Sequence, residues 1–259
     1  MSMEVKNLRF SYGEHEVLKG ISFRAEEGEF ISVLGPNGVG KSTLFRTLLG
    51  LMRPSQGRVA VGGRDIATMS PAELSRAMAY IPQSHNPVFN FSVLDMVLMG
   101  TTSQVSRFSV PGKEQIKLAD AALERLNISH LRDRACGYIS GGERQLVLIA
   151  RAIAQQAKIL VMDEPSANLD FGNKIRVMRT VKGLTEDGFT VIQSTHDPDQ
   201  AYLYSDKILA LYDGRILSWG APQVVMTSET ISKLYNVDVE VCSMQGDAAR
   251  VCVPANIRK

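Results

Sequence analysis

The sequence predicts an α/β fold, with a core built on a mainly parallel sheet, an N-terminal antiparallel β subdomain and an inserted α-helical subdomain. Three observations lead to this prediction. From residue 158 onward, strand-like apolar runs alternate with helical patterns, which is typical of a parallel sheet covered by helices. Residues 3–34 alternate as strands do, and residues 84–157 are rich in helical patterns.

Strand patterns dominate the chain before the helical region. Apolar residues recur at Val5, Leu8 and Phe10 and predict a strand, and the compact apolar run at 30–34 predicts another. Further alternation marks residues 17–23. The other elements expected here are a helix over 41–51, a strand over 58–61, a helix that starts after Ser70 with Pro71 and Glu73 in its first turn, and a strand over 78–81 ending at Pro82.

The middle of the chain contains mainly helical patterns and a polar loop at 101–112. Ile116, Ala119, Leu123 and Leu126 mark one face of a helix. We therefore expect a helical subdomain inserted into the sheet-bearing core.

The last hundred or so residues return to alternating strands and helices. We expect a single domain over 1–259, with a core formed by 1–83 and 158–221, a helical subdomain over 84–157 and a C-terminal extension over 222–259. The expected elements are strands in KILVMD, FTVIQST, KILALY and RILSWG, helices from about 172 and near 198, and a tail with two short helices followed by two short strands.

The composition is that of an ordinary soluble globular protein, with 44% hydrophobic and 22% charged residues. A net charge of +2 gives no broad field for nucleic acid or an anionic membrane. The cysteines, Cys136, Cys242 and Cys252, form no C-x-x-C pair, so zinc and dithiol chemistry lack support. No signal core or run of ~18 apolar residues is present, so a cytosolic chain that serves a membrane only through a partner is expected.

The segment GPNGVGKST at 35–43 lies between a predicted strand and a predicted helix, as the phosphate loop of a P-loop NTPase does. Its glycines let backbone N–H groups surround phosphate oxygens, and the helix start adds partial positive charge. The expected phosphate-binding residues are Gly35, Asn37, Gly38, Gly40, Lys41 for the β- and γ-phosphates, Ser42 also as a ligand of Mg²⁺, and Thr43 for the α-phosphate.

Two adjacent carboxylates end the predicted strand of KILVMDEP. Asp163 is placed to bind Mg²⁺ as the acidic residue of such a nucleotidase does. Glu164 can act as a general base that polarises an attacking water. The alternative, a surface pair that caps the next turn, becomes weak beside a phosphate loop.

The stretch Ser140-Gly141-Gly142-Glu143 has the pattern of a capping box at a helix start. Its two glycines leave the backbone N–H groups accessible, so the stretch can bind an anion. Because the chain already has one phosphate loop, this second site binds another ligand or completes the nucleotide site of another copy. A plain capped helix is the remaining alternative.

In motif, order and spacing, GPNGVGKST, ISGGERQ, ILVMDEP, SANLD and STHD resemble the ATP-binding-cassette family over essentially the whole chain. This resemblance implies that two copies stack head to tail. It also implies that Ser140, Gly141, Gly142 and Glu143 of one copy clamp the γ-phosphate held by the other. One departure is Glu143, which stands where the family most often has glutamine.

The resemblance implies roles for four further residues. Tyr12 would stack on adenine. Gln83 would contact Mg²⁺ or water and join the core to the helical subdomain. Asp170 would lie in the loop that faces the opposite copy, and His196 would contact the γ-phosphate and brace Glu164.

A cassette without a membrane span implies separate membrane subunits and resembles those of importers. Softer resemblances, in LDFGN, HDPDQA and the tail, indicate uptake of iron–siderophore, haem or cobalamin. The expected function is therefore ATP hydrolysis with Mg²⁺ at the cytoplasmic face of the membrane. The expected partners are a second copy, permease subunits and, indirectly, a solute-binding protein, with no nucleic acid. The alternative is a soluble scaffold ATPase, such as one for iron–sulphur-cluster assembly.

Overall fold

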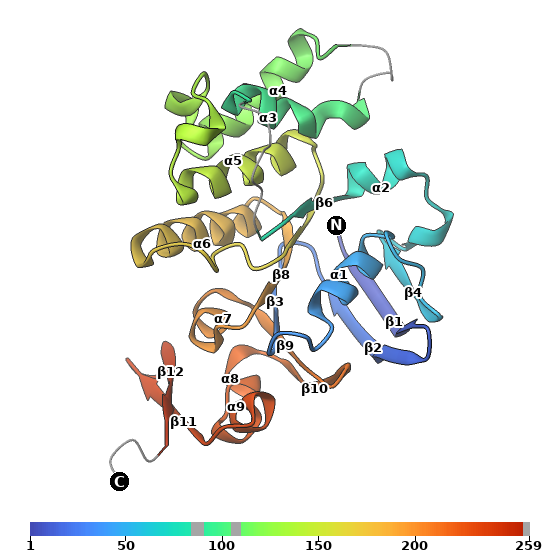
Figure 1. Cartoon of the computed structure of the whole chain (residues 1–259), viewed down its shortest axis with the longest axis vertical. Coiled ribbons are helices and arrows are strands. Elements are labelled where there is room, and N and C mark those ends of the chain that lie inside the picture. Colours follow the sequence, from blue (N-terminus) through green and yellow to red (C-terminus); the bar gives the residue numbers. More distant parts are fainter. Residues whose placement is uncertain (84–90, 105–109, 256–259) are drawn as a thin grey trace.

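The computed structural model describes residues 1–83, 91–104 and 110–255. Within them a six-stranded sheet forms the centre of the molecule, in the order β10-β9-β3-β8-β7-β6 (Figure 1). Five of these strands are parallel, and only β10 runs antiparallel to its neighbour. The strands are β3 (Phe30–Leu34), β6 (Met78–Ile81), β7 (Ile159–Met162), β8 (Thr190–Thr195), β9 (Lys207–Tyr212) and β10 (Arg215–Gly220).

A second, antiparallel sheet contains the N-terminal strands, in the order β2-β1-β4-β5. Helix α1 (Lys41–Leu48) packs between this sheet and the central one, because Leu44, Phe45 and Leu48 are buried in the same cluster as residues of both sheets. Helix α2 (Pro71–Ala77) follows, and Ser70 caps it in the predicted capping box. The four strands are β1 (Met3–Tyr12), β2 (His15–Ala25), β4 (Gln56–Val61) and β5 (Arg64–Asp65).

Helices α3 (Val93–Leu98), α4 (Lys113–Arg125) and α5 (Gly141–Ala154) form the predicted helical subdomain, at the top of Figure 1. Ala119, Leu123 and Leu126 of the predicted face are buried in one cluster with α5 and with α6 (Phe171–Glu186). The polar loop predicted at 101–112 starts later than expected, because a 3₁₀ turn, Met99–Gln104, covers its first residues. Residues 105–109 of that loop lie outside the described residues.

The C-terminal extension packs against the edge of the central sheet. Its cluster joins Val225, Met226, Ile231 and Leu234 to residues of β9 and of α7 (Pro198–Tyr204). The elements are α8 (Pro222–Val225), α9 (Ser228–Tyr235) and a hairpin of β11 (Val239–Met244) and β12 (Ala249–Pro254), as predicted.

The predicted fold class is confirmed, including the antiparallel subdomain and the inserted helices. The helix predicted over 41–51 is shorter, because Gly50 takes a left-handed backbone with φ of 70°. Among the described residues, no helix combines the length and the apolar character that crossing a bilayer requires. The exact division into core, subdomain and extension stays a prediction.

Candidate functional site

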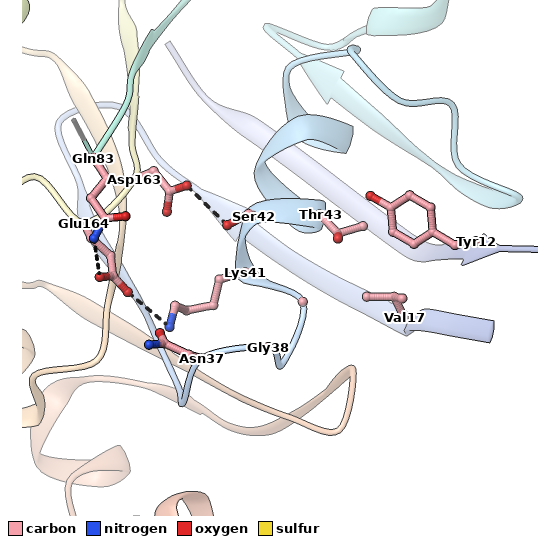
Figure 2. Close-up of a pocket in the computed structure, with 11 residues that line it drawn as sticks. Tyr12, Val17, Asn37, Gly38, Lys41, Ser42, Thr43, Gln83, Asp163 and Glu164 are labelled. Carbon is pink, nitrogen blue, oxygen red and sulfur yellow. Dashed lines mark hydrogen bonds and ion pairs between the residues drawn. The ribbon is translucent and has the colours of Figure 1, made fainter. Parts of the chain in front are cut away.

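A cavity of about 480 Å³ lies between the N-terminal sheet and the carboxyl ends of the central strands (Figure 2). Segments far apart in the sequence meet here: the ends of β1, β6 and β7, the loop after β3 and the start of α1. This is the edge of an open parallel sheet at which ligands bind. The lining residues are Tyr12, Val17, Asn37, Gly38, Gly40, Lys41, Ser42, Thr43, Gln83, Asp163 and Glu164.

The phosphate loop has the backbone that the sequence predicts. Gly38 and Gly40 take left-handed conformations, with φ of 81° and 108°, which residues with side chains rarely adopt. Gly40 is the N-cap of α1, and no side chain caps that helix end. The first N–H groups of α1 therefore face the cavity as an anion site. Gly35 has another reason to be glycine, because a Cβ there would lie 2.6 Å from the carbonyl oxygen of Leu211.

The amine of Lys41 lies at the bottom of the loop, and its side chain is only 6% exposed. Its Nζ donates to the carbonyl oxygens of Gly35 at 2.7 Å and Pro36 at 3.2 Å. It also lies 3.4 Å from Oε1 of Glu164. Burial lowers the pKa of Lys41, whereas the neighbouring carboxylates raise it. A buried cation held this way is suited to bind phosphate.

Asp163 follows β7 and is held by three hydroxyl groups. Ser194 Oγ donates to its Oδ1 at 2.5 Å. Ser42 Oγ lies 3.3 Å and Tyr80 OH 3.4 Å from its Oδ2. These hard oxygen atoms fit Mg²⁺, which usually takes one or two protein ligands together with phosphates and waters. The described part of the chain holds no cluster of three or more His, Cys, Asp or Glu that could bind a metal by itself.

Glu164 is the point at which three other side chains converge. Its Oε2 lies 3.1 Å from Nδ1 of His196 and 3.3 Å from Nε2 of Gln83, while Oε1 faces Lys41 (Figure 2 shows the last two). The backbone of Glu164 is left-handed, with φ of 44°. Its N–H donates to Ser194 Oγ at 3.0 Å. Such a conformation costs about 1–3 kcal/mol and persists only where the surrounding structure holds it.

Tyr12 closes the opposite end of the cavity (Figure 2). Its ring is 47% exposed and packs edge to face on Phe10, with 4.9 Å between the ring centroids. Its hydroxyl lies 3.4 Å from the sulfur of Met52. An exposed ring fixed in this way offers a surface on which a planar base can stack.

The stretch Ser140-Gly141-Gly142-Glu143, called the signature stretch below, lies apart from this cavity, at the N-terminus of α5. None of its residues is among the lining residues. The predicted capping box is confirmed: Glu143 N donates to Ser140 Oγ at 3.2 Å, and Ser140 N donates to Glu143 Oε2 at 2.8 Å. The hydrogen bond from the Ser140 N–H lowers the pKa of Glu143. The replacement of the family's usual glutamine therefore preserves the helix start.

Packing gives Gly142 a role that the sequence does not reveal. Gly142 is buried, and a Cβ there would lie 2.6 Å from Cγ of Asn173 on α6. Gly141 is exposed, and its Cβ would make only an ordinary contact with Leu169 at 3.4 Å. Gly142 therefore also lets α5 and α6 approach closely, a packing role that adds to the predicted one (Figure 1).

Asp170 lies at the start of α6, beside the signature stretch and away from the cavity lining. Its carboxylate is the N-cap of the helix and accepts from Asn173 N at 2.9 Å and Asn173 Nδ2 at 2.7 Å. The hydrogen bond from the Asn173 N–H lowers the pKa of Asp170. A role toward another copy stays a prediction for this residue.

Four residues at the site were not predicted: Val17, Tyr80, Ser194 and Tyr235. Ser194 links Asp163 to the backbone of Glu164. Tyr235 OH donates to the backbone oxygen of His196 at 2.8 Å. The sequence carried a signal for two of them: Tyr80 is the polar position of the predicted strand MAYI, and Ser194 is the first residue of STHD.

A family model described as "ABC transporter" matches residues 18–167. An uncharacterised ABC transporter ATP-binding protein of Haemophilus influenzae is 43% identical over 241 residues, which cover 93% of this chain and 92% of the relative. A probable iron chelatin transport ATP-binding protein of Helicobacter pylori is 36% identical over 93% of this chain and 95% of the relative. A hemin import ATP-binding protein of Bradyrhizobium diazoefficiens is 33% identical over 99% of this chain and 96% of the relative.

Solved structures show the same fold. A chain of an ABC transporter of the metal-chelate type, in an inward-facing conformation, matches with a TM-score of 0.86 and 32% identity, over 98% of this chain and 97% of that one. An ATP-binding cassette in its ADP conformation matches with a TM-score of 0.83 and 29% identity, over 91% of this chain and 99% of that one.

Proposed function

This chain belongs to the ABC transporter family, and from that membership we propose that it is the ATP-hydrolysing subunit of an importer of metal chelates. The observation that carries this proposal is the position of Glu164, beside Lys41 of the phosphate loop and in contact with His196. A base and a phosphate-binding cation thus line one cavity, and an imidazole outside that lining contacts the base. This combination suits phosphoryl transfer to water.

Nucleotide binding follows from the lining of the cavity. The N–H groups of the loop and of the first turn of α1 donate to phosphate oxygens, and Lys41 adds a full positive charge. Adenine stacks on the exposed ring of Tyr12. Thr43, on the first turn of α1, donates to the α-phosphate.

Mg²⁺ would be held by the hydroxyl oxygen of Ser42 and the carboxylate of Asp163, with Gln83 nearby. When bound, it would neutralise charge on the β- and γ-phosphates. Ser194 and Tyr80 fix the two oxygens of Asp163 in one orientation. The site residues therefore supply an oriented ligand rather than a flexible one.

Hydrolysis uses Glu164 as the general base. A water oxygen attacks the γ-phosphorus, its proton passes to the carboxylate of Glu164, and the bond from the γ-phosphorus to the bridging oxygen breaks, which releases ADP and phosphate. His196 and Gln83 hold Oε2 of this carboxylate through their ring and amide nitrogens. Because the side chain is only 10% exposed, its orientation is well defined.

We propose that a second copy, inverted, completes each site. The N-terminus of α5 exposes Gly141 and the Ser140 hydroxyl away from the chain's own cavity. A helix start of this kind binds anions, and the γ-phosphate held by another copy is such an anion. Asp170 caps the neighbouring helix and lies on the same side.

The permease is proposed to dock in a groove of about 380 Å³ between the core and the helical subdomain. Leu51, 69% exposed, Leu74 of α2 and Gln155 at the end of α5 line it together with Tyr80. The groove therefore touches both parts that nucleotide binding would move relative to each other. Metal chelate as cargo is supported by relatives whose names state iron chelatin, hemin and petrobactin transport.

The deciding experiment isolates the tagged chain from detergent-solubilised membranes of its own host. An integral membrane protein should co-purify, and the complex in proteoliposomes should hydrolyse ATP faster when a solute-binding protein loaded with a ferric chelate is added. Leu51→Glu should abolish the co-purification, whereas Leu203→Glu, at an exposed leucine on α7, should not. Co-purification with soluble scaffold proteins alone would contradict the importer and favour a scaffold ATPase.

A further inference from the structure

We propose that Tyr235 of the C-terminal extension is a positioning residue for His196, so that the extension acts in ATP hydrolysis. This role depends on the proposed function, because His196 matters only if it orients Glu164 and the γ-phosphate. The key contact is the hydrogen bond from Tyr235 OH to the backbone oxygen of His196, at 2.8 Å. Tyr235 is the last residue of α9 and lies 39 positions after its partner.

His196 lies in a short link between β8 and α7, and its side chain is 52% exposed. Nδ1 of its ring contacts Oε2 of Glu164. Because the side chain is half exposed, the backbone of the link helps to set the position of the imidazole.

The link is held on both sides of His196. Before it, the carbonyl oxygen of Thr195 accepts from Gly35 N of the phosphate loop at 3.3 Å. After it, Asp197 caps α7 and forms an ion pair with Lys174 of α6. Tyr235 supplies the hydrogen bond at the residue between these two anchors, where the imidazole is attached.

Helix α9 is rigid enough to serve as a support. Ile231 and Leu234 are each 1% exposed and pack in the cluster that also contains residues of β9 and α7. The side chain of Thr227 caps the start of the helix. Ser232 Oγ, facing the hairpin, accepts from Val239 N at 3.0 Å.

The hairpin fastens the extension to α7 a second time. Cys252 N donates to Oδ1 of Asp199 at 3.0 Å. Tyr202 OH donates to the backbone oxygen of Asp247 at 2.7 Å. Within the extension itself, Arg250 donates from Nε to Oδ1 of Asp247 and from Nη1 to the backbone oxygen of Met226, each at 2.7 Å. The hairpin is therefore joined to α7, and Tyr235 joins α9 to the link at His196.

The hydroxyl of Tyr235 keeps its proton at neutral pH and can donate. Burial raises its pKa, and the carboxylates of Asp197 and Glu164 and the thiol of Cys252 raise it further. A carbonyl oxygen can only accept, so the direction of this hydrogen bond is fixed.

The test compares Tyr235→Phe with Tyr202→Phe in the full chain. Tyr235→Phe keeps the ring and removes the hydrogen bond to His196, and should lower kcat for ATP hydrolysis about five- to tenfold with KM changed less than about twofold. Tyr202→Phe removes a hydrogen bond of similar length that joins α7 to the same extension, without touching the link. It should lower Tm by a similar amount and leave kcat unchanged.

A double-variant cycle shows whether Tyr235 acts through His196. In the His196→Ala background, Tyr235→Phe should change the residual rate by less than about twofold, since the group that it positions is gone. An equal loss of kcat in Tyr202→Phe, a full loss in the His196→Ala background, or normal kcat in Tyr235→Phe would each overturn the positioning role. Normal hydrolysis in His196→Ala alone would instead contradict the proposed catalytic site.

Discussion

Oε2 of Glu164 lies 3.1 Å from Nδ1 of His196, across 32 positions of sequence. The two residues follow neighbouring parallel strands, β7 and β8, so their side chains meet at the carboxyl edge of the sheet. The base of the proposed reaction and the group that orients it are thus fixed by strand order. In the proposed mechanism, hydrolysis depends on both residues, whereas nucleotide binding depends on the loop after β3.

Glu164→Gln separates these two steps. The amide keeps the shape and can still accept from Gln83, but it cannot take a proton from water. We expect ATP affinity within about threefold of wild type and kcat reduced about 10³-fold or more. Equilibrium binding of ATP measures the affinity, and phosphate release measures kcat. Lys41→Ala is the comparison variant, which should lose ATP binding. Undiminished hydrolysis in Glu164→Gln would remove this residue from the mechanism.

Ser140→Arg tests the head-to-tail pair. The long cation would block the start of α5, so ATP should no longer induce a dimer of the Glu164→Gln chain in size-exclusion chromatography with light scattering. Binding of ATP to the monomer should be unchanged. Ser70→Arg is a matched control, because it removes the serine of another capping box, on α2. A normal ATP-induced dimer in Ser140→Arg would contradict the role of the signature stretch.

The two signature glycines should differ in their effect on stability. Gly142→Ala places a methyl group 2.6 Å from Asn173 and should lower the free energy of unfolding by about 1–3 kcal/mol. In Gly141→Ala the new methyl group meets only Leu169, at 3.4 Å. This variant should leave the free energy of unfolding unchanged or raise it by up to about 1 kcal/mol. Urea unfolding measures both. Equal values for the two variants would contradict the packing role of Gly142 against Asn173.

The pKa of Glu143 predicts a pH-dependent effect of Glu143→Gln. Because the hydrogen bond from Ser140 N–H lowers this pKa below 4.5, the carboxylate stabilises the fold above about pH 4.5. That contribution is lost as the pH falls through the folded-state pKa. The Tm of Glu143→Gln should lie below wild type at about pH 7, and the gap should close at low pH. A gap that is constant with pH would contradict the charged capping box.

Local sequence patterns predicted the elements well because each carries its own signal. The phosphate loop, the carboxylates after β7 and the caps at Ser70 and Ser140 depend on residues close in sequence. The contacts of Ser194 and Tyr235 were not predictable in this way, because they follow from strand order and from where the extension packs. The contact of Gly142 with Asn173 was likewise not predictable, because it depends on how α5 packs against α6.

Strand β3 has consequences for how the polypeptide is made. Its neighbours in the sheet, β8 and β9, are synthesised long after it, since Phe30–Leu34 pairs with Thr190–Thr195 and Lys207–Tyr212. A nascent chain on the ribosome thus carries an apolar strand with both edges unpaired while the helical subdomain emerges. The site at the end of β3 is therefore assembled only after β8 and β9 have been synthesised.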